Sequence, residues 1–144
     1  MIFTKTLKFL SHNPALNLMD ITSKVNGVIK QSKVKDGQVL VFARHTTSAI
    51  LLQENEPRLH RDLDKFLHKL TPKDHNLYEH TNSPDHIEDK APNGHSHCAN
   101  VVLGASEIIP LLGGKLLLGT YQRIFFAELD RARNREVVVQ VMGE

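Results

Sequence analysis

Residues 38–53, QVLVFARHTTSAILLQ, hold two apolar runs on either side of a polar break at His45-Thr46-Thr47. The first run, 38–43, is rich in β-branched and aromatic side chains and has the length of one strand. The second run, 48–53, has the same apolar character. Strand–turn–strand is the simplest interpretation, and it predicts that His45 lies at the rim of a sheet.

The elements on either side of this stretch follow from periodicity. Polar and apolar residues alternate over residues 2–10, which predicts a half-buried strand. Asp20 is expected to cap a helix that runs to about residue 34, with Asp36-Gly37 as its stop. Further along, Pro57 opens a second predicted helix, and its apolar stripe ends just before Pro72.

The sequence of the C-terminal half predicts a short helix followed by strands. The helix is expected over 96–103, ended by Gly104. The strand-like runs cover 108–111, 115–118, 121–129 and 136–142, and they are separated by Gly113-Gly114 and by turns rich in Arg and Asn. The sequence therefore predicts an antiparallel meander in this half of the chain.

The order of these elements indicates the fold class. Strands and helices do not alternate strictly, as they would in a doubly wound fold. We therefore expect a single α+β domain over residues 1–144, with largely antiparallel sheets and two to three helices packed on one side. Val137-Val138-Val139 is apolar on both faces of its strand, which indicates burial at a subunit interface.

Composition excludes several classes of protein. Apolar residues make up 40% of the chain and charged residues 24%, which are globular averages. The net charge of +2 comes from scattered Lys and Arg without a basic stripe, so no nucleic-acid partner is expected. No apolar run approaches the roughly 18 to 20 residues of a membrane span, and the N-terminus lacks a signal peptide's apolar core. We expect a cytoplasmic protein with no membrane partner. Its single cysteine, Cys98, is expected to be buried.

Residues 73–94 lack periodicity, and a loop of roughly 20 residues is seldom found in a compact domain unless it is functional or disordered. Two or three histidines with a carboxylate make a typical catalytic site for a divalent metal. A solvated polar loop is the alternative. Five of the nine histidines and three acids gather in or just after this loop: His75, His80, Asp85, His86, Glu88, Asp89, His95 and His97.

Polar residues at the ends of strands form a second group of candidates. His45 offers a base, while Thr46 and Thr47 offer hydroxyl donors for phosphate. The alternative is a turn in which both hydroxyls satisfy backbone groups. Glu54 and Glu56 follow an apolar strand, where a carboxylate can act as a general base, orient a metal-bound histidine or cap the next helix.

A third group surrounds the predicted strand 121–129. Gln122 and Arg123 are polar groups at the entry of this apolar run, and Glu128 stands near its far end. A buried glutamate needs a partner, and an ion pair with Arg133 or Arg135 is the simplest one.

Several separate motifs, in order along almost the entire chain, identify it as similar to the YjbQ family, whose members are called secondary thiamine-phosphate synthases. The residues that carry the resemblance are His45-Thr46-Thr47-Ser48-Ala49, Glu54-Asn55, Asp62-Leu63, Tyr78-Glu79-His80, Asn93-Gly94-His95-Ser96-His97, Leu103-Gly104-Ala105-Ser106, and Leu118-Gly119-Thr120-Tyr121-Gln122 followed by Glu128.

The resemblance implies a β-sandwich-like α+β fold, a homotrimer with sheets packed around a threefold axis, and a site near the subunit boundary. The associated activity joins a pyrimidine pyrophosphate to a thiazole phosphate and releases pyrophosphate. Many relatives have tryptophan where Tyr121 stands, and most have Lys or Arg where this chain has Ala99. The latter difference removes a natural phosphate contact.

These observations together predict an enzyme that acts on a small phosphorylated metabolite with a divalent metal, Mg²⁺ or Zn²⁺. Hydrolysis of such a metabolite by a metal-bound water is one alternative, and a non-enzymatic trimeric protein that binds a metal or metabolite is another. The expected catalytic residues are His45, Glu54 and Asp89; the expected phosphate ligands are Arg44, Thr46, Thr47, Gln122 and Arg123; and the expected metal ligands are His45, His80 and His97.

Overall fold

The computed structural model describes all residues of the chain except 13–16 and 85–91. It has an α+β fold with two sheets and three α-helices, and every strand pair within the described residues is antiparallel. The predicted fold class and strand orientation are therefore confirmed. None of the helices in the described part has both the length and the apolarity of a membrane span.

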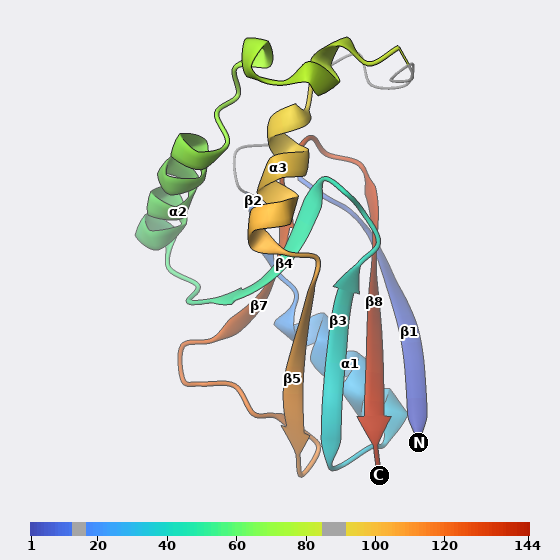
Figure 1. Ribbon diagram of the computed structural model, residues 1–144. Coiled ribbons are helices and arrows are strands. Elements are labelled where there is room, and N and C mark those ends of the chain that lie inside the picture. The colour runs from blue at the N-terminus through green and yellow to red at the C-terminus, as the bar shows by residue number, and fades with distance from the viewer. Residues whose placement is uncertain (13–16, 85–91) are drawn as a thin grey trace.

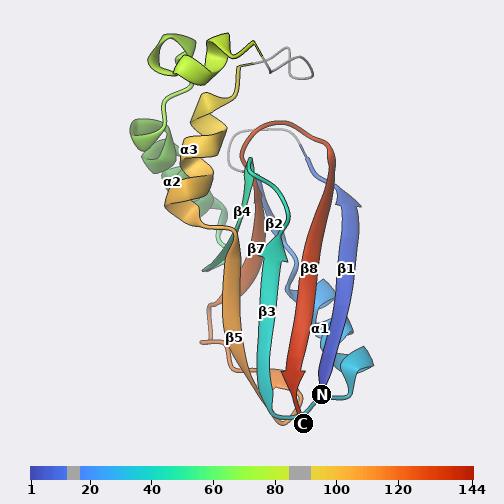
Figure 2. The ribbon, with the colours of Figure 1, turned by 45° about the vertical axis from the view of Figure 1, so that its right-hand side comes forward.

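The larger sheet has five strands, and its long strands stand side by side in Figures 1 and 2. Their spatial order is β1 (Ile2–Leu10), β8 (Asn134–Gly143), β3 (Gly37–Ala43), β5 (Ser106–Leu112) and β6 (Lys115–Leu116). The smaller sheet has the order β2 (Asn17–Asp20), β7 (Arg123–Glu128) and β4 (Ser48–Gln53). The first and last long strands of the chain are thus neighbours.

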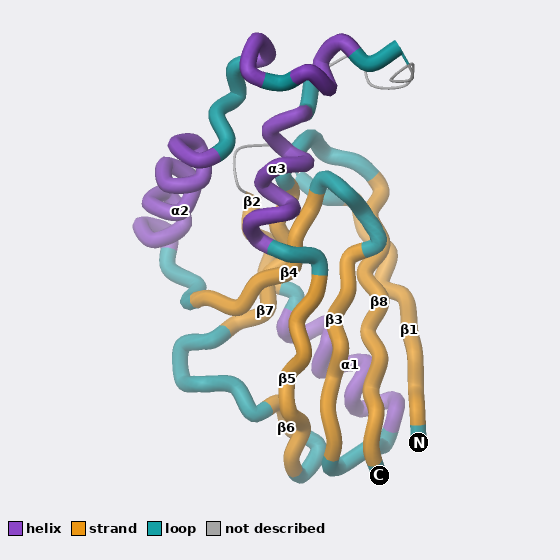
Figure 3. The backbone as a smooth tube through the Cα atoms, in the orientation of Figure 1, coloured by secondary structure: helices purple, strands orange, loops and turns teal. Residues whose placement is uncertain are grey.

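In Figure 3 the first helix lies behind the five-stranded sheet, and the other helices lie in the upper left part of the molecule. They are α1 (Thr22–Ser32), α2 (Pro57–Leu70) and α3 (Gly94–Leu103), with short 3-10 turns η1 (His75–Leu77) and η2 (Glu79–Asn82). The α1 helix buries Val25, Val28 and Ile29 because they recur at helical spacing. The α2 helix starts with proline at its first position, and the Glu56 carboxylate accepts a hydrogen bond from the Leu59 amide at 2.7 Å.

One apolar cluster joins both sheets to α1. Val39 and Val139 contribute to it from the five-stranded sheet, and Ile50 and Phe126 from the three-stranded sheet, all fully buried. Alternate residues of β8 point into this cluster, because successive side chains of a strand point to opposite faces. The opposite face of the five-stranded sheet stays open and carries exposed apolar side chains: Ile2, Leu10, Phe42, Ile108 and Leu112.

Strands β3 and β8 approach each other most closely at their ends, where Gly37 pairs with Gly143. A Cβ on Gly37 would lie 2.0 Å from the Met142 carbonyl oxygen, and a Cβ on Gly143 would lie 2.0 Å from that of Asp36. Both residues also have positive φ, 156° and 152°. Glycine is therefore required at both positions.

The hairpin predicted at 38–53 is wrong, because β3 and β4 lie in different sheets. The chain crosses from one sheet to the other at residues 44–47. Residues 48–50 are buried without alternation although β4 is an edge strand of its sheet, because α3 and the residue after it cover that edge: Asn100 donates to the Ser48 carbonyl, and the Ile50 amide donates to the Gly104 carbonyl. The predicted meander is also wrong. The buried alternate valines of β8 belong to a central strand, and β8 inserts between β1 and β3 while β7 joins the other sheet.

Boundaries around α1 and the 73–94 loop also differ from expectation. Asp20 is the last residue of β2, and its Oδ1 accepts from the Thr22 amide at 3.0 Å just before the helix. The helix ends at Ser32, followed by Lys33 in the left-handed region with φ 63°, so Asp36-Gly37 is not its stop. Part of the predicted loop forms η1 and η2. Cys98 is exposed on α3, contrary to expectation, since it lies on the side of the helix opposite buried Ala99 and Ser96.

Candidate functional site

A cavity of about 330 Å³ opens where the β3–β4 connection, the start of α3 and the β7–β8 connection meet. These connections lie in the upper half of Figure 1, below the 3-10 turns. We call this cavity the rim pocket. The residues that line it are Arg44, His45, Thr46, Thr47, Asn93, His97, Arg133 and Arg135.

Strand register brings these segments together. Ser48, the first residue of β4, pairs with Glu128, the last residue of β7. Ala43, the last residue of β3, pairs with Val137 near the start of β8. The two crossing segments, 44–47 and 129–133, therefore lie at the same end of the molecule. His45 and Arg135 end up in one pocket although they are far apart in sequence.

A buried ion pair forms the floor of the rim pocket. The Glu128 and Arg135 side chains are 1% and 2% exposed. Arg135 Nε donates to Glu128 Oε1 at 2.8 Å, and its Nη2 donates to Glu128 Oε2 and, at 3.1 Å, to Thr47 Oγ1. The predicted pairing of Glu128 is confirmed for Arg135. The Thr47 hydroxyl oxygen already accepts a hydrogen bond from Arg135, so its first role is to hold the ion pair in place.

A second layer of hydrogen bonds holds the pair in place. The Ser11 hydroxyl donates to Glu128 Oε1 and accepts from the Arg133 amide at 3.1 Å. The Asp130 amide donates to Glu128 Oε2 at 3.3 Å. The Asp130 carboxylate accepts from the Asn93 amide group at 3.1 Å and from the Arg133 guanidinium at 2.5 Å. These contacts tie the residue after β1 and the β7–β8 connection to the Glu128 carboxylate, and the start of α3 to the Asp130 carboxylate.

The His45 ring is held as a neutral hydrogen-bond donor. Its Nε2 accepts from the Glu136 backbone amide at 2.7 Å, so the proton of the neutral ring lies on Nδ1. Burial lowers the pKa of His45, and the nearby Arg135 guanidinium lowers it further. Nδ1–H is therefore the polar group that His45 can offer to a ligand.

The predicted metal ligands are brought together only in part. The His80 and His97 rings lie edge to face with centroids 4.7 Å apart. His45 Nε2 is occupied by the Glu136 amide, and the residues that the structure describes contain no group of three His, Cys, Asp or Glu placed to share an ion. Asp89 lies outside the described residues. Two imidazoles do not complete a catalytic zinc site, which uses three protein ligands, so the described residues do not fit the expected metal centre.

The remaining predicted residues lie at the other end of the β4–β7 ladder. Gln53 pairs with Arg123 there, five residues from the Ser48–Glu128 pair, and five residues of strand span roughly 17 Å. Glu54 follows Gln53 directly, and its backbone carbonyl oxygen lies 3.3 Å from His60 Nε2. Glu54, Gln122 and Arg123 are thus separated from His45, because antiparallel pairing places the start of β7 beside the end of β4.

Arg135, Arg133 and Asn93 were not among the predicted site residues. A signal was present in the sequence 130–135, DRARNR, where three arginines precede an apolar strand. That signal indicated only an ion pair for Glu128. Its meaning for the site depends on β8 pairing with β3, which no local pattern specifies.

The comparisons with known proteins agree with one another. The model of the family described as UPF0047 protein YjbQ-like matches residues 6–144. A UPF0047 protein of Methanothermobacter thermautotrophicus is 42% identical, covering 99% of this chain and 94% of that protein. The UPF0047 protein YugU of Bacillus subtilis is 29% identical, with 88% and 89% covered. The crystal structure of a hypothetical protein from Aeropyrum pernix K1 has a TM-score of 0.87 and 33% identity, with 99% of each chain covered. A protein of unknown function from Sulfolobus solfataricus P2 has a TM-score of 0.85 and 31% identity, covering 100% of this chain and 99% of that one.

Proposed function

The chain belongs to the UPF0047 YjbQ-like family, and from this membership and the rim pocket we propose that it binds and transforms a small phosphorylated metabolite. The proposed reaction is group transfer of the kind associated with secondary thiamine-phosphate synthases. A thiazole phosphate attacks a pyrimidine pyrophosphate in that reaction, and pyrophosphate departs.

The observation that carries this proposal is the set of oriented arginines in the rim pocket. Arg44 pairs with Glu136 at 3.1 Å, and Arg135 pairs with Glu128. A guanidinium has five N–H donors, and a bidentate carboxylate occupies only two of them. The hydrogen bonds of Arg135 use Nε and Nη2, and its Nη1 has no acceptor within the described residues. Arginines fixed in this way suit the recognition of phosphate oxygens.

The same geometry suits a departing pyrophosphate. A new bond forms between the thiazole nitrogen and the pyrimidine methylene carbon, while the carbon–oxygen bond breaks and its electron pair leaves with pyrophosphate. Arg135 and Arg44 would stabilise the negative charge that develops on the leaving oxygen. Neutral His45 would add a hydrogen bond from Nδ1–H, and the exposed Thr46 hydroxyl could add another. No proton transfer by the protein is required for this step.

A trimer is part of the proposal. The open face of the five-stranded sheet carries Ile2, Ile108 and Leu112, each more than half exposed. Exposed apolar side chains on one face of a sheet are a common feature of protein–protein interfaces. We propose that this face packs against further copies of the chain in a homotrimer. Sedimentation equilibrium tests this, and a monomer at micromolar concentration would refute it.

A metal-dependent hydrolase is the second candidate, and it would need further ligands besides the adjacent His80 and His97 rings. Two adjacent imidazoles can contribute to a Zn²⁺ site, whereas Mg²⁺ would be held through oxygen ligands such as the substrate phosphates. This alternative predicts release of inorganic phosphate from a phosphorylated substrate, and loss of that release when His97 is changed to alanine.

Incubation of the purified protein with Mg²⁺ and both phosphorylated substrates tests the main proposal. We expect thiamine phosphate to form, and His45→Gln and Arg44→Gln to lower kcat/KM by about tenfold or more, since each removes a donor to a charged group. Arg58→Gln on α2 is the matched control, because Arg58 is exposed and does not line the rim pocket. If both rim variants formed product as fast as the unchanged protein and the Arg58→Gln control, the proposed site would be ruled out.

Measurement of pyrophosphate binding by the same variants distinguishes the remaining candidate functions. Binding without product formation would favour a non-enzymatic metabolite-binding protein. Phosphate release without joining of the two substrates would favour the hydrolase. Absence of both binding and turnover would overturn the assignment of the rim pocket to phosphate.

A further inference from the structure

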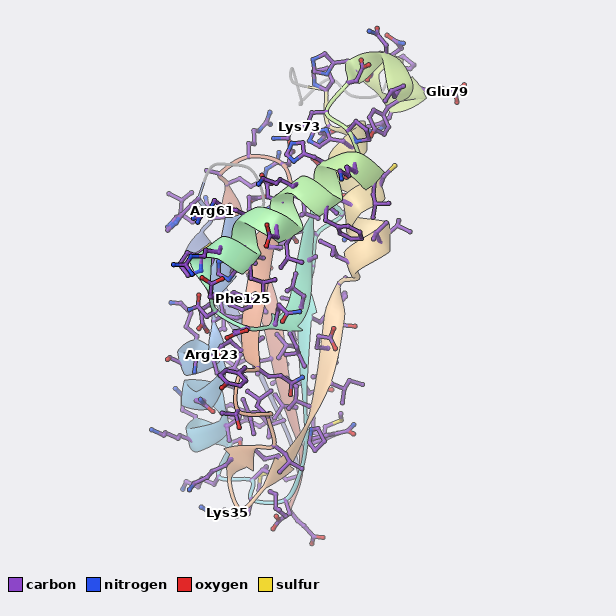
Figure 4. All side chains as sticks on the ribbon, turned by 90° about the vertical axis from the view of Figure 1, so that its left-hand side faces the viewer. Lys35, Arg61, Lys73, Glu79, Arg123 and Phe125 are labelled. Atoms are coloured by element: carbon purple, nitrogen blue, oxygen red, sulfur yellow. The ribbon has the colours of Figure 1, made fainter. Side chains whose placement is uncertain are left out.

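A second cavity, of about 540 Å³, lies between α1 and the loop 113–123, at the opposite end of the β4–β7 ladder from the rim pocket. We call it the lysine cavity. Figure 4 shows Arg123 and Lys35 in this part of the molecule, far from Lys73 and Glu79 at the other end. The residues that line it are Thr22, Asn26, Lys30, Gly114, Lys115, Leu116, Leu118, Gly119, Thr120, Gln122 and Arg123.

Cations outnumber acids in and around this cavity: the Asp20 carboxylate pairs with Arg123 at 2.7 Å, and the Asp36 carboxylate accepts from the Gly113 amide at 2.9 Å beside it. The cations Lys30, Lys115 and Arg123 line it, and no acidic side chain is among the described residues that do so. A Cβ on Gly114 would lie 3.7 Å from Lys35 Nζ, so a fourth cation borders the wall. The sequence explains this bias, because neither residues 21–35 nor residues 113–123 contain an Asp or Glu. A chain with a net charge of only +2 has thus gathered positive charge here.

Part of the polar lining of the cavity is held in place by hydrogen bonds within the protein. Arg123 Nε donates to Asp20 Oδ2 at 2.7 Å, which orients the guanidinium and engages one edge of it. Gln122 Oε1 accepts from the Gly119 amide at 2.8 Å, so its Nε2 remains as a donor. The Gly114 amide donates to the Lys35 carbonyl at 2.8 Å and ties the loop to the end of α1. Walls held in this way lower the cost of ordering on binding.

We propose that the lysine cavity is a binding site for the phosphate or diphosphate group of a small metabolite, separate from the rim pocket. Its volume is in the usual range for small-molecule sites, roughly 300 to 1,000 Å³. Asp20 engages only the Nε side of Arg123, and the described residues give Lys30 and Lys115 no ion pair. These donors favour an anion, and phosphate accepts several of them at once. The roughly 17 Å between the two ends of the ladder means that one phosphate cannot contact both sites in one chain.

Tryptophan fluorescence gives a local readout for this site. The chain contains no tryptophan, and Tyr121 is 70% exposed between two residues that line the cavity. Tyr121→Trp therefore places a single reporter beside the cavity. Titration of this variant with inorganic pyrophosphate at low ionic strength is expected to change its emission with a saturable dependence on concentration.

Charge-removing variants in the Tyr121→Trp background then test the assignment. Lys30→Ala with Lys115→Ala is expected to weaken pyrophosphate binding by about tenfold or more, since charge-assisted hydrogen bonds are lost. Lys65→Ala, an exposed change on α2, is the control and should leave binding unchanged. Equal affinity in the double variant and the control, or no saturable response at all, would overturn the proposal.

Two further measurements distinguish this proposal from the function proposed for the rim pocket. Arg44→Gln should weaken binding at the rim pocket and leave the response of the tryptophan reporter unchanged. A reporter response that disappears in Arg44→Gln would show that only the rim pocket binds phosphate, and so would overturn the separate site. A response to an RNA oligonucleotide in the absence of any response to pyrophosphate would also overturn it.

Discussion

The rim pocket and the lysine cavity both gather cations, but they hold them in opposite ways. Arg135 of the rim pocket is 2% exposed and shares a buried ion pair with Glu128. Lys30 and Lys115 of the lysine cavity are exposed to solvent. A buried charge must keep its partner for the protein to stay folded, whereas an exposed charge is solvated in either state. The positive charge of Arg135 therefore supports the fold as well as lining a pocket, whereas the charges of Lys30 and Lys115 are not needed for folding.

The largest test of this contrast is removal of the buried carboxylate. We expect Glu128→Leu to lower the free energy of unfolding by about 3 to 5 kcal/mol, because it leaves the Arg135 guanidinium buried without its partner. Urea denaturation measures the change. Adding Arg135→Met to this variant should recover most of the loss, since no unpaired charge then remains. A double variant as unstable as Glu128→Leu alone would show that the loss comes from packing.

The next effect concerns Thr47, whose buried hydroxyl accepts from Arg135. We expect Thr47→Val to lower the free energy of unfolding by about 1 to 3 kcal/mol, because a charged donor loses one acceptor. Thr46→Val is the matched control, since Thr46 is exposed, and its change should stay within about 0.5 kcal/mol. Equal losses at the two positions would remove the distinction between the floor and the mouth of the rim pocket.

A smaller effect should depend on pH. His45 has a folded-state pKa lowered from 6.5 by burial, with Arg135 as the next cause. The unfolded chain therefore takes up protons first as pH falls through 6.5, so stability should decrease there and level off below the folded pKa. His95 contributes in the same direction. His45→Gln should flatten this part of the profile of denaturation midpoint against pH. An unchanged profile would mean that His45 is solvated in the folded protein.

The smallest effect on stability is expected in the lysine cavity. Lys30→Ala with Lys115→Ala should change the free energy of unfolding by no more than about 0.5 kcal/mol, because both side chains are exposed. Thermal denaturation at low and at physiological salt measures it. A loss comparable to that of Thr47→Val would show that these lysines support the fold, and the contrast between the two regions would fail.

Elements set by local patterns were predictable from the sequence. Alternation over residues 2–10 gave β1, and Pro57 with its apolar stripe gave α2, since both patterns act within a few residues. The placement of β8 between β1 and β3 was not predictable, because it pairs Ile2 with Met142 across nearly the full length of the chain. The crossing from β3 to β4 was misread as a hairpin for the same reason: two apolar runs around a short polar break fit either arrangement.

The residues of the candidate site also fall into those that a local pattern predicts and those that depend on strand pairing. His45 was predicted at a sheet rim from its position after an apolar run, and the structure places it at the end of β3. Arg135 was predicted only as a partner of Glu128, and Ser11 was not predicted at all, because their approach to Thr47 and Glu128 depends on which strands become neighbours. Gln122 and Arg123 were grouped with His45 by chemistry, whereas the antiparallel β4–β7 pairing separates them.

Gly37 and Gly143 limit how this sequence can drift over evolutionary time. Elsewhere in the core, a larger side chain at one position can be offset by a smaller one beside it, as between Ile50 and Phe126. At Gly37 and Gly143, a Cβ atom would lie 2.0 Å from a backbone carbonyl oxygen on the opposite side of the pairing. A smaller neighbouring side chain cannot relieve this clash, because the clashing atom belongs to the backbone. Descendants that keep the β3–β8 pairing must therefore keep both glycines, and a lineage that loses one must rebuild the end of the sheet.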